Sequence, residues 1–336
     1  MNEPINLHAI ADKIGAWCES MRVATAPYGT YRFSLNDEPN YYASADVALT
    51  RALIGEDLKS LSESHRDQWA GVLNARQNPI DGHYAPEIGH HIFHANGMVT
   101  NALCLIGRQY QYPVGLYNIF NTPDRISAWL SQINWDNPWS ASHLVWGGPV
   151  FWMNSSLATD EWKDATFAWF DRQLNQYGSW PKEFPNRNDR DISPLGAAVH
   201  IWPLYRHEGR EVPGLERLAD CVVDWQNPDG YWDKIGGYGT MDALYVLSVG
   251  IEKDLPRAPV YRDALYRYVK PHFTRGHAPW VTVNAHFVLG WTSCIGYLQR
   301  GLPDLFVGDI SWGDIFDVKA YYDLDSVIGP DTATLD

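Results

Sequence analysis

The sequence predicts an all-α protein, an (α/α)6 barrel or toroid of about six helical hairpins. A short phrase with Gln, then a Gly or Pro turn, then Trp or Tyr, returns about every fifty residues. Its clearest copies are 77–84 and 226–232, and looser copies occupy 132–139 and 173–180. A repeat of this length is one supersecondary unit, so the chain is expected to fold as an array of such units. Strand patterns are scarce.

Two kinds of helical segment alternate with these turns. Segments 45–55, 97–107 and 240–247 are apolar nearly all round, which predicts inner helices buried on both sides. Segment 213–225 carries apolar residues on one stripe and charges opposite, which predicts an outer helix. An outer helix, a turn and an inner helix form one hairpin, and closure of the hairpins into a barrel leaves no exposed end repeat.

The domain organisation follows from where the repeats occur. They run from about residue 27 to about residue 295 without a flexible linker or a block of like charges. We therefore predict one toroid domain over residues 1–307. Residues 308–336 are aromatic and acidic without a helical period, and we expect an irregular C-terminal tail that packs on the barrel.

Composition excludes several classes of partner. A net charge of −14 over 336 residues argues against nucleic acid and anionic membrane surfaces, which require clustered Lys and Arg. The sequence has no long apolar run and no signal-peptide pattern at its start, so a cytoplasmic protein is expected. The four cysteines show no CxxC spacing, which indicates reduced thiols. No nucleotide-binding motif is present, and no cofactor is predicted.

Aromatic residues are abundant and often stand in the turns. The chain has 16 Trp and 19 Tyr, and aromatic residues make up 14% of the total. Sugar rings and isoprenoid chains both bind against aromatic faces, so the excess indicates a lined cavity. The alternative is that the turn Trp side chains hold adjacent helices together.

The phrase at 224–232, followed by 240–244, resembles the Gln-Trp repeats of terpenoid cyclases and protein prenyltransferases. Segment 193–213 is similar to uncharacterised bacterial toroid proteins. The α/α toroid is also the scaffold of six-hairpin glycosidases and several polysaccharide lyases. This resemblance implies a fold and leaves the reaction open, because one scaffold carries many chemistries. The Asp-rich motifs of the cyclases are absent, and Cys221 lies on a predicted outer helix, away from any prenyltransferase-like zinc site.

Carboxylates at the starts of inner helices are the first catalytic candidates. Glycoside hydrolysis needs two carboxyl groups that flank the scissile bond. Asp191 and Asp242 form the leading pair, with Asp46 and Glu87 in reserve. Asp191 could instead cap a helix ahead of Pro194. Burial among apolar neighbours would raise the pKa of Asp242.

Histidines are the second catalytic candidates. His90 and His94 are four residues apart and would share one helix face, with His91 between them. They suit acid–base chemistry or zinc chelation, but the HExxH glutamate and a third ligand are not apparent, so no metal is predicted. His143 and His286 follow turns into inner helices and are further catalytic candidates. The alternative for each is a hydrogen-bonded core histidine.

The predicted substrate-binding residues share the same loops and helix starts. Asn284 is a candidate because a uronate lyase needs a neutral hydrogen-bond donor for the substrate carboxylate. The complete set is Tyr41, Tyr42, His90, Asn96, Trp139, Tyr238, Trp280 and Asn284.

These observations favour a carbohydrate-active enzyme, with a glycoside hydrolase ahead of a lyase. It would bind a small-molecule or oligosaccharide substrate in an aromatic cavity and use carboxylate or histidine acid–base chemistry. Two alternatives stay open: a terpenoid cyclase, dehydratase or isomerase, and a non-catalytic binding protein.

Overall fold

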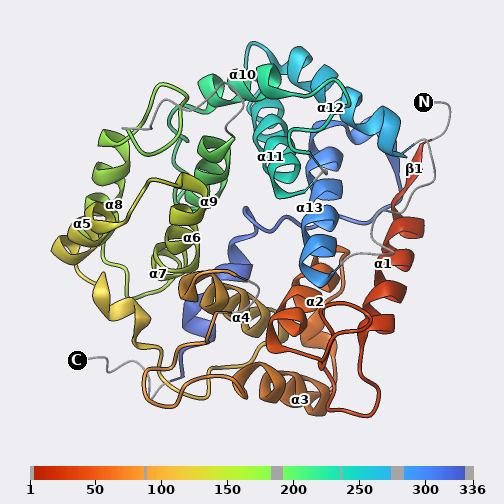
Figure 1. Cartoon of the computed structure of the whole chain (residues 1–336), viewed down its shortest axis with the longest axis vertical. Helices are drawn as coiled ribbons and strands as arrows, with labels where there is room; N and C mark the ends of the chain where they lie inside the picture. Colours follow the sequence, from red (N-terminus) through yellow and green to blue (C-terminus); the bar gives the residue numbers. More distant parts are fainter. Residues whose placement is uncertain (1–3, 87–88, 183–191, 235–236, 274–283, 330–336) are drawn as a thin grey trace.

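The computed structural model describes residues 4–86, 89–182, 192–234, 237–273 and 284–329. These residues form two concentric rings of helices (Figure 1). The outer ring consists of α1 (Leu7–Met21), α3 (Glu63–Asn74), α5 (Pro123–Gln132), α8 (Asp160–Arg172), α10 (Leu215–Trp225) and α12 (Ala258–Phe273). The inner ring consists of α2 (Tyr41–Leu53), α4 (Ile92–Ile106), α6 (Pro138–Gly147) with its short continuation α7 (Pro149–Met153), α9 (Ser193–His207), α11 (Tyr238–Glu252) and α13 (Ala285–Gly301).

The inner ring closes on itself. Each inner helix packs on the next in chain order, and α13 packs back on α2. Every residue of α2 is buried, and α11 is buried from Gly239 to Ile251, whereas α10 buries a single stripe. The predicted all-α toroid is therefore confirmed, and so is the division into apolar inner and amphipathic outer helices. None of the described helices is long and apolar enough to cross a membrane.

Side-chain caps begin several of these helices. The side chains of Asn40, Asn137 and Asn284 each accept a hydrogen bond from the backbone N–H of the third residue of the helix that follows, α2, α6 and α13 respectively. Such a cap satisfies an otherwise unpaired N–H group and stabilises the first turn. The caps fix where these inner helices begin.

Side chains of the turn phrases hold neighbouring parts of the barrel together through hydrogen bonds. Gln77 donates from Nε2 to the carbonyls of Gly82 and Tyr112 and accepts at Oε1 from two backbone N–H groups of the next hairpin. Trp180 and Trp232, the last residues of two of these phrases, are buried and donate from Nε1 to backbone carbonyls. Part of the aromatic excess therefore serves packing between helices, as the alternative interpretation held.

Replacing Gln77 by Ala is expected to lower the free energy of unfolding by about 3 kcal/mol. The change leaves two carbonyls and two N–H groups without the buried side chain that pairs with them. Urea denaturation of the variant measures the loss. Gln132→Ala is the matched control, because Gln132 occupies the same place in an exposed copy of the phrase. If the urea midpoint of Gln77→Ala equalled that of this control, the stabilising role of the Gln77 hydrogen bonds would be contradicted.

The chain after α13 runs across the C-terminal ends of the inner helices (blue coil at the centre of Figure 1). The Gly313 N–H donates to the Leu53 carbonyl at the end of α2, and Asn101 of α4 donates to the Tyr321 carbonyl. A two-residue parallel pair, β1 (Ile5–Asn6) with β2 (Phe306–Val307), lies near its start. The described short 3-10 helices are η1 (Leu58–Ser60), η2 (Gly115–Ile119), η4 (Pro303–Leu305), η5 (Lys319–Tyr322) and η6 (Leu324–Ser326).

His207 at the end of α9 joins this segment to the inner ring. Its Nε2 lies 2.8 Å from the Phe316 carbonyl and its Nδ1 lies 2.9 Å from Nδ2 of Asn154. The carbonyl requires a proton on Nε2, and the amide donor requires an unprotonated Nδ1. Neutral imidazole meets both needs.

The stability of the protein is expected to fall as the pH drops from about 6.5 towards 4, in part through His207. Burial is the main cause that lowers the pKa of His207 from 6.5 to about 4. Between these values the unfolded chain binds a proton that the folded protein does not, so stability is present above pH 6.5 and is lost on acidification. The full contribution is about 3 kcal/mol. Urea midpoints measured across this range should decline less steeply in His207→Gln than in the wild type, while exposed His65→Gln should match the wild type.

A histidine-lined cavity as the candidate active site

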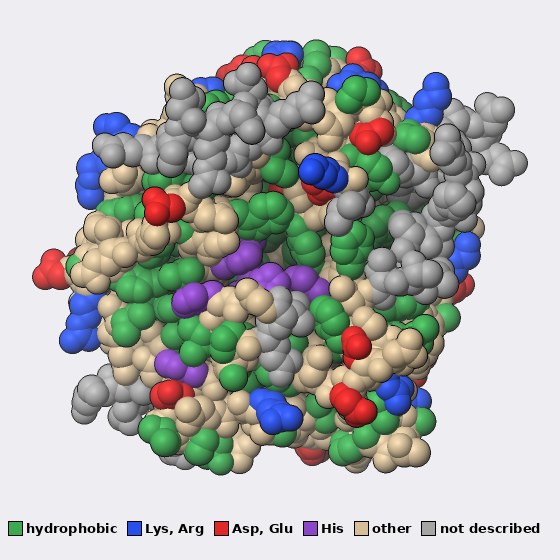
Figure 2. All heavy atoms as spheres, viewed as in Figure 1, with side chains coloured by type: hydrophobic (Ala, Val, Ile, Leu, Met, Phe, Trp, Pro, Cys, Tyr) green, Lys and Arg blue, Asp and Glu red, His purple; other side chains and the backbone are tan. Residues whose placement is uncertain are grey.

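A cavity of about 140 Å³ lies inside the inner ring. Figure 2 shows histidine side chains gathered near the middle of this face. Ile315 and Phe316 of the C-terminal segment contribute to its lining, so the segment that crosses the helix ends forms part of its wall. The full lining is His90, His94, Met98, Trp139, His143, Trp146, His200, Tyr238, Met241, Asp242, His286, Leu289, Ile315 and Phe316.

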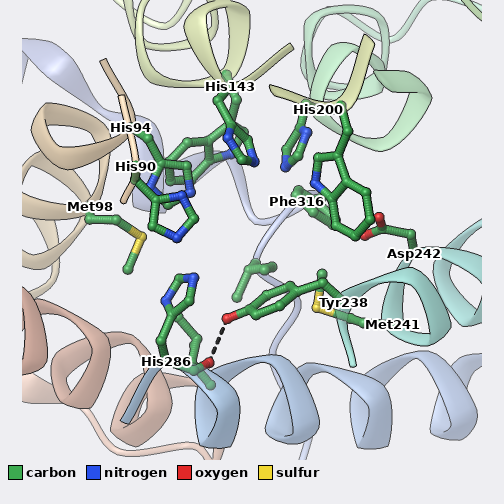
Figure 3. Close-up of a pocket in the computed structure, with 14 residues that line it drawn as sticks. His90, His94, Met98, His143, His200, Tyr238, Met241, Asp242, His286 and Phe316 are labelled. Carbon is green, nitrogen blue, oxygen red and sulfur yellow. Dashed lines mark hydrogen bonds between the residues drawn. The ribbon is translucent and has the colours of Figure 1, made fainter. Parts of the chain in front are cut away.

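Five of these lining residues are histidines, and they come from different inner elements. His94 lies on α4, His143 on α6, His200 on α9 and His286 on α13, and His90 lies two residues before the start of α4. The ring centroids are 4.2 Å apart for His90 and His94, and 4.6 Å apart for both His94–His143 and His143–His200. The centroid of His286 is 5.0 Å from that of His90. Figure 3 shows the five rings around one common space.

In three of the histidines, Nδ1 contacts the side chain of a buried neighbouring residue. Nδ1 of His94 lies 2.7 Å from the Tyr42 hydroxyl, and Nδ1 of His200 lies 2.9 Å from the Ser142 hydroxyl. Nδ1 of His286 lies 2.9 Å from Oδ1 of Asp46, which is fully buried on α2. With Nδ1 occupied in each case, Nε2 is the nitrogen left for a ligand in the cavity.

Burial keeps most of these histidines neutral. It lowers the pKa of His90 to about 4, with a smaller contribution from the charge of His286, and it lowers the pKa of His200 to about 3. Burial and the neighbouring histidines hold the pKa of His94 and that of His143 well below the ordinary value. At neutral pH these rings are therefore lone-pair donors and neutral N–H donors, not cations.

The pKa values of the acidic groups at the site are shifted in the opposite direction, upward. Burial, reinforced by Asp233, raises the pKa of Asp242 well above its ordinary value. Its Oδ2 is buried and has no hydrogen-bond partner. Burial also raises the pKa of Asp46, although His286 opposes that shift. Burial raises the pKa of Tyr238, whose hydroxyl donates to the His286 carbonyl (Figure 3). Asp242 and Tyr238 thus favour their protonated forms.

Half of the predicted site residues lie together at this cavity. They are Asp242, His90, His94, His143, His286, Trp139 and Tyr238. Tyr42 is just behind them as the partner of His94. Their roles in catalysis and binding stay predictions.

Other predicted residues lie elsewhere. His91 is exposed, caps α4 and stacks on Phe93, so it is not part of the cavity lining. The Tyr41 hydroxyl donates to the Ala85 carbonyl, and Asn96 donates to the Ile92 carbonyl within α4. Asn284 is the α13 cap described above. Asp191 and Trp280 lie outside the described residues.

The sequence interpretation missed several lining residues. His200 is an isolated ionisable residue in the apolar segment 195–204, a pattern that is normal for a core histidine. Its position on an inner helix was the available signal. Ile315 and Phe316 belong to a segment without periodicity, so no pattern pointed to them. The others are Met98, Trp146, Met241 and Leu289.

Searches against protein-family models and against curated proteins find no match to this chain. Among solved structures, a polysaccharide lyase is similar, with a TM-score of 0.46 and 13% sequence identity over 90% of this chain and 99% of the lyase chain. Similarity at this level gives no information about the reaction, which has to be argued from the cavity itself.

Proposed function

We propose that the protein is a lyase that cleaves a uronate-containing oligosaccharide by β-elimination. The observation that carries the proposal is the pair formed by His286 and the buried carboxylate of Asp46, with the other nitrogen of His286 left for the cavity. An imidazole oriented in this way by a carboxylate is a suitable general base near neutral pH.

His286 would act as the base. Asp46 accepts the Nδ1 proton, which leaves an unprotonated Nε2 to take a proton from the substrate. The abstracted proton is the one on the carbon next to the uronate carboxylate. Tyr238 contributes to positioning, because its hydroxyl fixes the backbone of His286 and its ring centroid lies 4.8 Å from the imidazole.

Asp242 would act as the acid. Its raised pKa favours the protonated carboxyl, and its unpartnered Oδ2 belongs to a residue that lines the cavity. In the elimination, His286 takes the proton from carbon, a carbon–carbon double bond forms, and the bond to the glycosidic oxygen breaks. Asp242 supplies the proton to the leaving oxygen, and exchange with water restores both groups.

Two features of the lining support a sugar substrate and elimination. Trp139 and Trp146 offer aromatic faces of the kind on which sugar rings stack. Among the described lining residues Asp242 is the single carboxylate, whereas hydrolysis calls for a pair of them across the scissile bond. The neutral histidines can donate N–H groups to the uronate carboxylate.

Mass spectrometry of a mixed panel tests the proposal. The purified protein is incubated with uronate oligosaccharides, neutral oligosaccharides and terpenoid alcohols. The expected result is uronate fragments whose masses sum to that of the substrate, together with the ultraviolet absorbance of a conjugated double bond. Fragments whose masses sum to that of the substrate plus one water would show that the protein is a hydrolase and not a lyase. A converted terpenoid with every sugar intact would reject both.

A further inference from the structure

We propose that His90, His94 and His143 form a binding site for a divalent transition-metal ion, with Zn²⁺ as the best match. Each of the three residues offers one ring nitrogen, and these nitrogens all lie within 4.8 Å of one another. The ring centroids are 4.2, 4.6 and 5.3 Å apart. The sequence alone suggested only the His90–His94 pair, because the third ligand lies on the neighbouring helix α6.

The donor set matches zinc chemistry. Three imidazole nitrogens with one open position are the ligand pattern of a catalytic zinc site, with bonds of about 2.0–2.1 Å. Nitrogens around one tetrahedral ion are then roughly 3.3 Å apart. The three rings would therefore close by about 1.5 Å at most, which side-chain rotation can supply. Ligands that are all nitrogen select zinc, copper, nickel or cobalt over magnesium and calcium.

The surroundings support a bound cation in three ways. Nδ1 of His94 is engaged by the Tyr42 hydroxyl, the kind of outer contact that fixes the orientation of a metal-bound imidazole. The described lining contains no Lys or Arg, so a cation meets no fixed positive charge there. Asp46 buries one carboxylate oxygen without a hydrogen-bond partner, and its other oxygen pairs with His286, which lines the same cavity. A nearby cation would offset the cost of this buried charge.

All three histidines line the cavity that His286 and Tyr238 also line, so an ion held by them would be within reach of a ligand in that cavity. There the ion would take the carboxylate of the substrate and draw electron density from the carbon that loses its proton. This role in substrate binding rests on the proposed function. Metal binding itself does not, because it depends only on the three histidines.

Isothermal titration of chelator-treated protein with Zn²⁺ tests the site. We expect one ion per chain with a Kd in the micromolar range or below, and a Kd about 100-fold higher for His143→Ala. His91→Ala is the matched control, because His91 is an exposed neighbour of the site and should leave the Kd unchanged. Absence of stoichiometric binding would overturn the proposal, as would binding that is lost in the His91 variant and kept in the His143 variant.

X-ray absorption of the zinc-loaded wild type gives an answer that does not depend on any variant folding. The expected spectrum has imidazole nitrogen neighbours at about 2.0–2.1 Å. A shell of oxygen alone, or one with sulfur, would reject the histidine site. The two proposals fail separately: zinc binding without turnover of any uronate rejects the lyase, and elimination by a protein that binds no zinc rejects the metal site.

Discussion

Replacing His286 by Ala is expected to reduce kcat/KM for uronate elimination by a factor of about 10²–10⁴. The change removes the nitrogen that takes the proton from carbon and leaves Asp46 buried without its partner. The measurement is the initial rate of double-bond formation on the best uronate substrate of the panel. Circular dichroism and the urea midpoint of each variant show whether the barrel is intact.

Two further variants make the result specific. Asp46→Asn keeps the shape of the carboxylate but not its charge, so a positioning role predicts a lower kcat with a nearly unchanged KM. His91→Ala, at an exposed position outside the cavity, should keep wild-type kinetics. If folded His286→Ala retained more than a tenth of the wild-type kcat/KM, His286 would not be the base.

The fold was accessible from the sequence because its signals are local and repeated. A turn phrase that returns with each hairpin, and helices that are apolar all round, define an inner and an outer ring before any contact is known. The segment from Leu302 to Gly329 carries no such period. Its conformation is set by contacts with residues far away in the chain, such as Leu53 and Asn101, and local pattern cannot encode those.

The candidate site was accessible from the sequence only in part. His90, His94 and His286 stand at or near the starts of inner helices, where the geometry of a toroid directs side chains to the centre. Contacts between residues on different helices of the ring could not be predicted from the sequence. Asp46 and His286 are joined only because α13 packs back on α2, which closes the barrel. The third histidine of the proposed metal site likewise required the packing of α4 against α6.

Replacing Asp317 by Leu is expected to lower the free energy of unfolding by about 3–5 kcal/mol. Oδ1 of Asp317 lies 2.6 Å from Nε of Arg206 on α9, and Oδ2 lies 3.0 Å from Nη2 of Arg300 on α13. The Tyr245 hydroxyl of α11 also donates to Oδ1, at 2.6 Å. One carboxylate thus ties the C-terminal segment to three inner helices. Without it, two largely buried guanidinium groups lose a charged partner, which is far more costly than losing an exposed pair.

Burial alone would raise the pKa of Asp317, but the charges of Arg300 and Arg206 and the hydrogen bonds to it outweigh burial, so its pKa is lowered. The stabilisation is therefore present at neutral pH and declines only as the carboxylate becomes protonated in acid. Glu252→Gln is the matched control, because Glu252 pairs with the same two arginines from a side chain that is 38% exposed. That change should cost about 1 kcal/mol or less.

Urea denaturation at pH 7 measures both changes. Because Ile315 and Phe316 directly precede Asp317 and line the cavity, release of this anchor should also weaken substrate binding, whereas the Glu252 control should keep it. An Asp317→Leu protein as stable as the Glu252→Gln control would show that apolar contacts alone hold the segment in place.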